Sequence, residues 1–176
     1  MKKVWLPIAI FLVSTISATE VEFVPYGGTV MVDGMKTEKT WIYPASFETG
    51  LSNRVAMWLI QDSGFVYICL KDLDTTHTGI DLYLDDMNGN RRLLHVSTAL
   101  GEKKWQDSSW SDFEWGANSF WTANVIQSIY RDGKMEYLAP ECFEFQISKA
   151  YFPARTFKIM VHLKPVSYTH LTLPTN

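Results

Sequence analysis

Gly79-Ile-Asp-Leu-Tyr-Leu-Asp-Asp-Met-Asn-Gly-Asn-Arg-Arg-Leu-Leu-His-Val-Ser-Thr98 contains two runs of alternating character on either side of an Asn-Gly pair. Successive side chains of a strand point to opposite faces, so Leu82 and Leu84 share one face of the first run. Asn-Gly between alternating hydrophobic runs is typical of a hairpin turn. The stretch therefore predicts an antiparallel β-hairpin.

The register of this hairpin decides which side chains share a face. A two-residue loop would pair Leu82 with His95. A three-residue loop at residues 88–90 pairs Leu82 with Val96 instead. It also places Asp86 opposite Arg92, so we prefer it because it separates apolar from polar side chains and joins opposite charges. In that register one face carries Asp81, Tyr83, His95 and Ser97.

Short β-rich runs separated by Gly, Asn and Asp recur along the rest of the chain. They cover residues 29–32, 54–61, 65–71, 79–85, 91–98, 121–129, 142–147 and 157–163. No segment keeps a helical period over three turns, and short strands with turn signals between them are typical of a sandwich or barrel. We expect an all-β fold, a single antiparallel β-sandwich of the jelly-roll kind.

Alternation within two of these runs predicts the core. The expected core side chains are Val66, Ile68, Leu70, Phe143, Phe145 and Ile147. The opposite set in the earlier run, which includes Tyr67 and Cys69, is not polar, so we expect that outer face to be partly covered. Trp58 alternates against Met57 and Leu59 in the same way.

The two ends of the chain are set apart from this domain. Lys2 and Lys3, the apolar residues 4–16 and the small pair Ser17-Ala18 have the pattern of a cleavable signal peptide. We therefore expect residues 1–18 to be removed and the mature protein to be secreted or periplasmic, with no membrane insertion after cleavage. Residues 166–176 are similar to the translation of a transposase-type sequencing adapter, the alternative being a natural Thr-rich tail. We expect the domain, residues 19–165, to be truncated at its C-terminus.

Composition limits the partner classes of residues 19–165. Without Lys2 and Lys3, 14 basic residues stand against 19 acidic ones, a net charge of −5. No basic cluster is dense enough to follow a phosphate backbone, which argues against nucleic acid. Cys69 and Cys142 have no spacing typical of a zinc site, and a disulfide between them requires that their strands be neighbours.

The oxygen-rich turn at residues 85–90 is interpreted as a solvated hairpin turn. Calcium is allowed there, or at Asp33 or Asp62, but Gly89 does not stand where a calcium-binding EF-hand loop needs its glycine. No cofactor is therefore predicted from a specific motif.

Two arrangements of catalytic residue types are present, but neither predicts an enzyme. Asp81 with Glu102 or Asp107 has the composition of a glycosidase pair, although nothing in the spacing requires them to be close. His95 with Asp81 and Ser97 has the composition of a triad, although Ser97 is expected within a strand rather than on a nucleophile elbow. We expect a hydrogen-bonded polar patch and no catalytic residues.

The segment at residues 104–116 carries tryptophans at a five-residue spacing that fits neither a strand nor a helix. These are Trp105, Trp110 and Trp115. We expect a long ordered loop. Its rings either cover the outer face that carries Trp58 and Tyr67 or remain free to stack on a sugar.

Several of these segments together resemble the family-nine carbohydrate-binding modules, which are secreted β-sandwiches related to polysaccharide-degrading enzymes. Val30-Met-Val-Asp-Gly-Met-Lys-Thr-Glu-Lys-Thr-Trp41 is similar to the family's opening motif, and Gly79-Ile-Asp-Leu-Tyr-Leu-Asp85 to one of its strands. Val55 to Asp62 followed by Phe65-Val-Tyr67, and Phe143 to Ile147 followed by Thr156 to Val161, continue the likeness in the expected order.

The resemblance implies a sugar-binding site. The family holds the end of a sugar chain between two Trp rings, with polar side chains of the sheet contacting the hydroxyls. Asp81 stands at the position of the family's sugar-contacting carboxylate, and His95 and Ser97 at its polar pair. The chain departs from the pattern at Thr75, which replaces the first clamp Trp, and at Met160, which replaces an amide.

Two functions follow as expectations. The first is an exported, non-catalytic carbohydrate-binding or glycan-recognition module. Its expected ligand-binding residues are Asp81, Tyr83, His95, Ser97, Trp105, Trp110 and Trp115. The alternative is a structural or protein-interaction β-sandwich that has lost sugar binding, which the departures at Thr75 and Met160 favour.

Overall fold

The computed structural model describes residues 24–39, 41, 44–48, 54–72, 77–86, 88–138, 140–151 and 158–165. The predicted signal peptide, the predicted adapter-derived tail and Thr75 lie outside the described residues. The described part is all-β and antiparallel, apart from one parallel bridge between Tyr26 and Gln61. Its one helical element is η1 (Lys149–Tyr151), a single 3₁₀ turn. None of its helices is long and apolar enough to span a bilayer.

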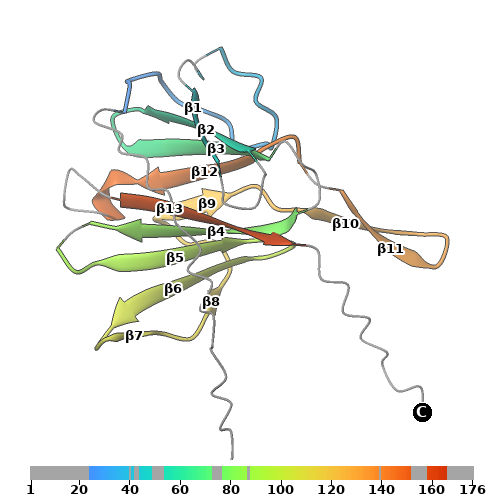
Figure 1. The fold of residues 1–176 in the computed structure, drawn as a ribbon. Coiled ribbons are helices and arrows are strands. Elements are labelled where there is room, and N and C mark those ends of the chain that lie inside the picture. The colour runs from blue at the N-terminus through green and yellow to red at the C-terminus, as the bar shows by residue number, and fades with distance from the viewer. Residues whose placement is uncertain are drawn as a thin grey trace, which may run out of the picture.

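Two sheets and a separate hairpin make up the fold (Figure 1). The first sheet has the order β1 (Pro44–Glu48), β2 (Arg54–Gln61), β3 (Phe65–Asp72), β12 (Phe143–Ser148), β9 (Trp121–Ala123). The second has the order β13 (Lys158–Pro165), β4 (His77–Asp85), β5 (Arg91–Val96), β6 (Leu100–Gln106), β7 (Ser109–Trp110), with β8 (Glu114–Trp115) also pairing with β6. The hairpin of β10 (Gln127–Arg131) and β11 (Lys134–Leu138) projects from the body.

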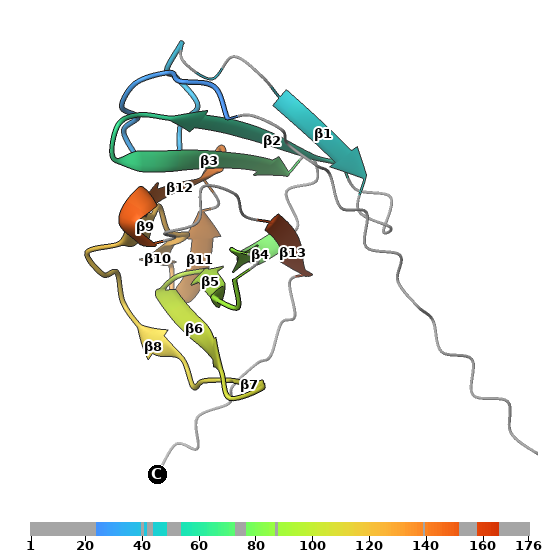
Figure 2. The ribbon, with the colours of Figure 1, turned by 90° about the vertical axis from the view of Figure 1, so that its left-hand side faces the viewer.

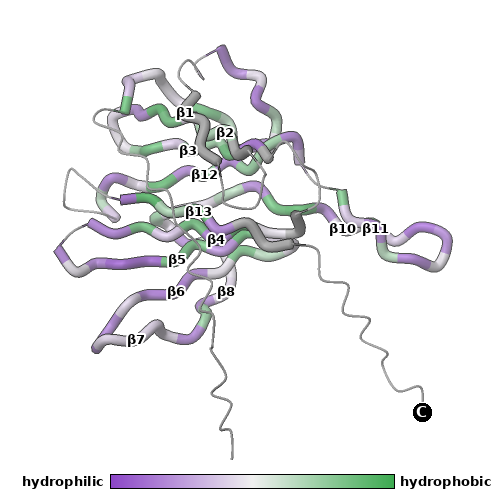
Figure 3. The backbone as a smooth tube through the Cα atoms, in the orientation of Figure 1, coloured by the Kyte–Doolittle hydropathy of each residue, from purple (hydrophilic) through white to green (hydrophobic). Residues whose placement is uncertain are grey.

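The core lies between the inner faces of the two sheets. In Figure 2, β2 and β3 lie above β4, β5 and β13. The first sheet contributes the six predicted core residues, all buried, together with Met57 and Leu59, and the second contributes Ile80, Leu82, Leu84, Leu94 and Val96. The hydropathy view shows the same division, with hydrophobic stretches in β2 and β3 and a hydrophilic tip on the β10–β11 hairpin (Figure 3). The expected β-sandwich is confirmed.

The register of the β4–β5 hairpin differs from both predicted alternatives. Asp81 pairs with His95 and Leu82 with Leu94, and the last pair before the turn is Asp85 with Arg91. The reason is Asp86, whose buried carboxylate accepts hydrogen bonds from the backbone N–H groups of Asn88 (2.9 Å) and Asn90 (3.0 Å). The observed register is shifted by two residues from the preferred one, and a two-residue shift leaves every side chain on its predicted face.

Several predicted element boundaries are also wrong. Residues 29–32 form no strand, and residues 121–129 divide into β9 and the start of β10. The strands β1 and β6 were not predicted. In β6, the run Gly-Glu-Lys-Lys at residues 101–104 shows no alternation of apolar and polar residues. The side chains on both of its faces are polar or absent, so the sequence does not indicate a strand there.

Candidate functional site

The outer face of the second sheet brings together every residue predicted for ligand binding. Asp81 and Tyr83 on β4 face outward beside His95 on β5, and His162 on β13 pairs with Asp81. A polar row therefore crosses three neighbouring strands. We call this surface the aromatic face. Its members are Asp81, Tyr83, His95, Ser97, Trp105, Trp110, Trp115 and His162.

A chain of hydrogen bonds links three of these side chains. Asp81 Oδ1 lies 2.6 Å from His95 Nδ1, and His95 Nε2 lies 3.0 Å from Ser97 Oγ. Asp81 is 4% and His95 8% exposed. The carboxylate and the imidazole are therefore engaged with each other beneath the surface, and Ser97 is the more accessible end of the chain.

His162 and Tyr83 border this chain. His162 Nδ1 lies 4.0 Å from Asp81 Oδ2, and its side chain is largely exposed. Burial and, to a smaller extent, the charge of Asp81 raise the pKa of Tyr83, so its phenol stays neutral and can donate a hydrogen bond. Sequence reasoning missed His162, although alternation along the last predicted strand would have found it. The half-buried Met160 lies opposite Tyr83 on β13.

The segment predicted as a long loop folds back over this face as β7 and β8. Trp105 and Trp110 pair across the β6–β7 turn with ring centroids 5.4 Å apart, and the ring of Trp110 meets Tyr83 edge to face at 5.9 Å. The expectation that these rings cover Trp58 and Tyr67 is wrong. The short β6–β7 turn holds the tryptophans against their own sheet.

Trp115 is the exposed member of this group, with 64% of its surface accessible. Its ring stacks on Phe113 with the ring centroids 4.8 Å apart, and it lies perpendicular to the His95 ring with the centroids 5.9 Å apart. Gly101 pairs with Trp115, and a Cβ built on Gly101 would lie 2.9 Å from Trp115 Cε3. The absence of a side chain at residue 101 is what lets the indole lie against the sheet.

The outer face of the first sheet is covered instead by residues 27–39 and Trp41. Val30 and Trp41 form a second buried cluster with Ile60, Tyr67 and Cys69. Asp62 fastens this cover, since its carboxylate accepts hydrogen bonds from Thr29 Oγ1 (3.2 Å) and Tyr67 OH (2.7 Å). The expected partial covering of Trp58 and Tyr67 is therefore present, but a different segment provides it.

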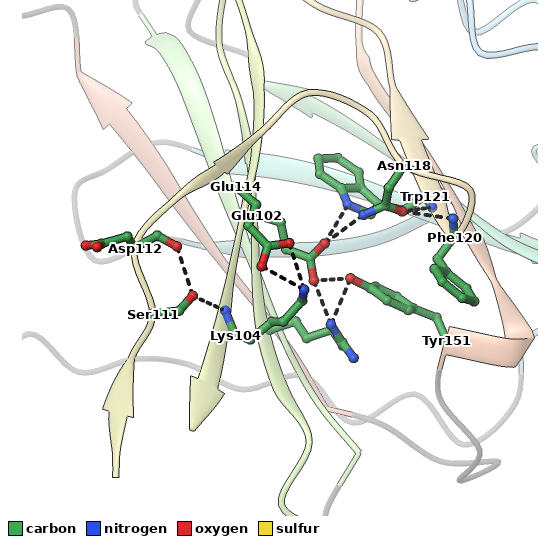
Figure 4. A network of polar contacts seen from close by, with 10 residues as sticks. Glu102, Lys104, Ser111, Asp112, Glu114, Asn118, Phe120, Trp121 and Tyr151 are labelled. Atoms are coloured by element: carbon green, nitrogen blue, oxygen red, sulfur yellow. Dashed lines mark hydrogen bonds and ion pairs between the residues drawn. The ribbon is translucent and has the colours of Figure 1, made fainter. Parts of the chain in front are cut away.

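A buried carboxylate network on the inner side of β6 was not predicted as a site (Figure 4). Glu102, 1% exposed, accepts hydrogen bonds from Arg92 Nη1 (2.7 Å), Asn118 Nδ2 (2.8 Å), Trp121 Nε1 (3.3 Å) and the hydroxyl of Tyr151. Burial, together with Glu102, raises the pKa of Tyr151. The network ties the chain at residues 118–121 and η1 to the second sheet.

An open pocket of about 250 Å³ lies beside this network. Its lining includes Glu102, Lys104 and Phe120, whose ring stacks on Tyr151 at 5.2 Å. The pocket and the aromatic face lie on opposite sides of the second sheet. Glu102 pairs with Leu94, whose side chain faces the core, whereas Asp81 pairs with His95 one residue further along β5, and side chains of successive residues point to opposite faces. The sheet therefore separates Asp81 from Glu102, and the two do not form a carboxylate pair.

Cys69 and Cys142 meet the condition set for a disulfide, because β3 and β12 are neighbours. The structure holds both as buried free thiols. Glu144 lies beside them on β12, and this cluster belongs to the covered face of the first sheet. It is distinct from the aromatic face.

Comparison of the chain with protein-family models, with curated proteins and with solved structures finds no match. The resemblance to the family-nine modules remains a prediction from the sequence. The aromatic face is therefore interpreted from its own geometry.

Proposed function

We propose that this protein is an exported, non-catalytic carbohydrate-binding module that recognises a glycan on its aromatic face. Export is supported by the charged, apolar and small-residue order of residues 1–18. Glycan recognition is supported by an exposed, fixed aromatic ring beside polar side chains. Sugar sites combine these two elements because a pyranose has both an apolar face and a rim of hydroxyls.

The observation that carries the proposal is the state of Trp115. An indole with 64% of its surface exposed would ordinarily rotate freely, but Phe113, His95 and the bare backbone of Gly101 hold this one. A ring that is fixed before binding loses little conformational entropy when a ligand stacks on it. The exposed surface of Trp115 is therefore already oriented for stacking against the flat apolar face of a sugar.

The polar row supplies the hydrogen-bonding groups. Ser97 and His162 are accessible and offer a hydroxyl and an imidazole to sugar hydroxyls. Asp81 and His95 are buried and orient this row rather than contact the ligand over a wide area. This division modifies the site predicted from the sequence, which assigned Asp81 a direct contact.

The order carboxylate, imidazole, hydroxyl also occurs in serine hydrolases, where backbone N–H groups stabilise the oxyanion. Here the N–H of Ser97 donates to Ala99 O (3.0 Å), and the N–H of Ala99 is directed at Ser97 Oγ (3.4 Å). Both donors are thus engaged within the turn. The arrangement favours binding over nucleophilic catalysis.

The test is isothermal titration of the full chain with a panel of neutral and acidic oligosaccharides, comparing wild type with Trp115→Ala. We expect wild type to bind at least one glycan and Trp115→Ala to bind it at least ~10-fold more weakly, as for a central aromatic contact. Tyr130→Ala is the matched control, since Tyr130 is a 72% exposed aromatic residue on β10. Absence of binding across the panel, or equal affinity of Trp115→Ala, would contradict the proposal.

The alternative, a structural or protein-interaction sandwich, is favoured by a different observation. The projecting hairpin exposes Tyr130, Met135, Tyr137 and Leu138. An isolated two-stranded hairpin is marginally stable in water, and exposed apolar side chains on it are typical of a contact surface. If no glycan binds, this alternative becomes the better account of the protein.

A further inference from the structure

A cluster of three metal-ligating residue types lies beneath the segment that covers the first sheet. Cys69 is on β3, Cys142 immediately precedes β12, and Glu144 is on β12. One ligand atom from each lies within 4.8 Å of those of the other two, and all three residues are buried. The cluster is independent of the aromatic face and of the function proposed for it.

Glu144 is only half satisfied. Its Oε2 accepts hydrogen bonds from the backbone N–H groups of Asp33 (3.0 Å) and Gly34 (2.9 Å). Its Oε1 is buried and has no hydrogen-bond partner among the described residues. Leaving a buried carboxylate oxygen without a hydrogen bond costs free energy, so we expect this oxygen to bind a further group. A Cys69–Cys142 disulfide would leave this oxygen unpaired, whereas a cation would engage all three groups.

The surroundings hold the ligands in position. Asn124 joins two of them, because its Nδ2 donates to Cys142 O (3.1 Å) and its Oδ1 accepts from the N–H of Glu144 (2.6 Å). The N–H of Cys142 in turn donates to Gly34 O (3.2 Å). These hydrogen bonds fix the backbone that carries two of the three ligands.

The electrostatics agree with a site where little positive charge balances the three acidic groups. Burial raises the pKa of Glu144 to about 7, against the effect of its two backbone donors. Contact with Cys142, followed by burial, raises the pKa of Cys69, and the nearby Lys36 opposes this only weakly. A divalent cation would compensate the negative charge of the three groups in their ionised forms.

We propose that Cys69, Cys142 and Glu144 bind a single Zn²⁺ ion through two thiolates and Glu144 Oε1. This donor set fits zinc, which takes cysteine sulfur together with carboxylate oxygen. Binding releases the two thiol protons, together with the proton of any protonated Glu144, to solvent and involves no change in oxidation state. Because Glu144 also holds the N–H groups of Asp33 and Gly34, the ion fastens the covering segment to the first sheet.

The experiment uses the full chain, reduced, treated with a chelator and exchanged into chelator-free buffer. Co²⁺ is titrated as a spectroscopic probe, followed by displacement with Zn²⁺. We expect a sulfur-to-cobalt charge-transfer band that saturates at one ion per chain and disappears when Zn²⁺ is added. Zn²⁺ should also raise the Tm of the wild type, because it binds the folded chain.

Variants test the ligand set. Cys142→Ser removes one of the two thiolates, so the charge-transfer band should lose the intensity typical of two sulfur ligands. Glu144→Gln should weaken Zn²⁺ binding at least ~10-fold. Glu141→Gln is the matched control, since Glu141 is exposed and pairs with Lys71, and it should bind like wild type. Circular dichroism identifies any variant that fails to fold. If a variant does not fold, the Co²⁺ and Zn²⁺ titrations of the wild type alone test the proposal.

Three results would overturn the proposal. The first is the absence of a charge-transfer band in reduced wild type with both thiols free. The second is a Cys69–Cys142 disulfide in protein isolated without reductant and containing no zinc. The third is a folded Glu144→Gln variant with unchanged affinity for Zn²⁺.

Discussion

The outer faces of the two sheets carry similar side chains but are covered in different ways. On the first sheet, Tyr67 is 1% exposed beneath residues 27–39 and Trp41, and hydrogen bonds to two buried carboxylates, Asp62 and Glu144, hold that cover. On the second sheet, a short excursion from β6 supplies the cover, and Trp115 remains 64% exposed. The difference teaches that an aromatic outer face can be either a second core or a binding surface, depending on how far its cover extends.

The nature of the contacts explains this contrast. Glu144 accepts hydrogen bonds from two backbone N–H groups of the covering segment, which is distant from it in sequence, and Asp62 accepts one from the Thr29 hydroxyl. The cover of the aromatic face depends on ring edges and on the β6–β8 pairing. Polar anchors fix a backbone in one position, whereas ring contacts leave one face of an indole accessible.

The largest expected effect on stability comes from Gly34→Ala, which disturbs the segment that covers the first sheet. Gly34 has φ +81, and a Cβ there would lie 2.8 Å from Asn124 Nδ2 and 2.9 Å from Pro140 Cβ. Backbone strain and crowding together should lower the free energy of unfolding by about 3 kcal/mol. Gly28→Ala is the control. Gly28 has φ +95 but no described atom within 4 Å of its Cβ position, so we expect a loss of only about 1 kcal/mol. Equal losses in denaturant melts would show that the cover is not tightly packed at Gly34.

Asp62→Asn should have the next largest effect, about 1–3 kcal/mol, because it weakens the hydrogen bonds that hold Thr29 and Tyr67. Burial alone would raise the pKa of Asp62, but hydrogen bonds from Tyr67 and from the backbone of Gly64 and Phe65 outweigh it and lower that pKa below 3.8. A lowered pKa stabilises the fold above pH 3.8, and this contribution is lost as the pH falls through the folded-state pKa.

The measurement for Asp62 is a series of unfolding experiments across acidic pH. The difference in free energy of unfolding between wild type and Asp62→Asn should be greatest at neutral pH and shrink below pH 3.8. A difference that stays constant with pH would contradict the assignment of a charged, anchoring Asp62.

On the aromatic face, Asp81→Asn should cost about 1 kcal/mol, because it replaces a charge-assisted hydrogen bond to His95 with a neutral one. The cost is smaller than at Asp62 because Asp81 anchors side chains rather than a distant segment. Thermal melts measure the stability, and titration with the glycan bound by wild type measures affinity. If Asp81→Asn loses binding without any loss of stability, Asp81 contacts the ligand directly instead of orienting His95.

The smallest effect on stability, within about 0.5 kcal/mol, is expected for Gly101→Ala, because the new methyl group meets only the ring ends of Trp115 and Phe113, two side chains at the surface that can move away from it. The same movement should weaken glycan binding several-fold, since it removes the fixed orientation of the indole. Unchanged affinity would show that the position of Trp115 is not needed for binding.

Local alternation was sufficient to predict much of this fold. It identified β2, β3 and β12 and the core-facing residues of β3 and β12, and it assigned Asp81 and His95 to one face even though the turn length was wrong. A strand has a period of two, so the sequence alone distinguishes one face from the other. It failed for β6, whose residues 101–104 show no apolar alternation, and for Asp86, whose capping of the turn set the register.

The sequence by itself determined the all-β class, the core faces of the central strands and the residue types available on each outer face. Only the tertiary structure decided which segment covers which face, and it placed Cys69 beside Cys142 and Glu144 although the two cysteines have no metal-site spacing. The physical reason is that side-chain direction follows from the local geometry of a strand, whereas strand order and covering contacts depend on residues far apart in the chain.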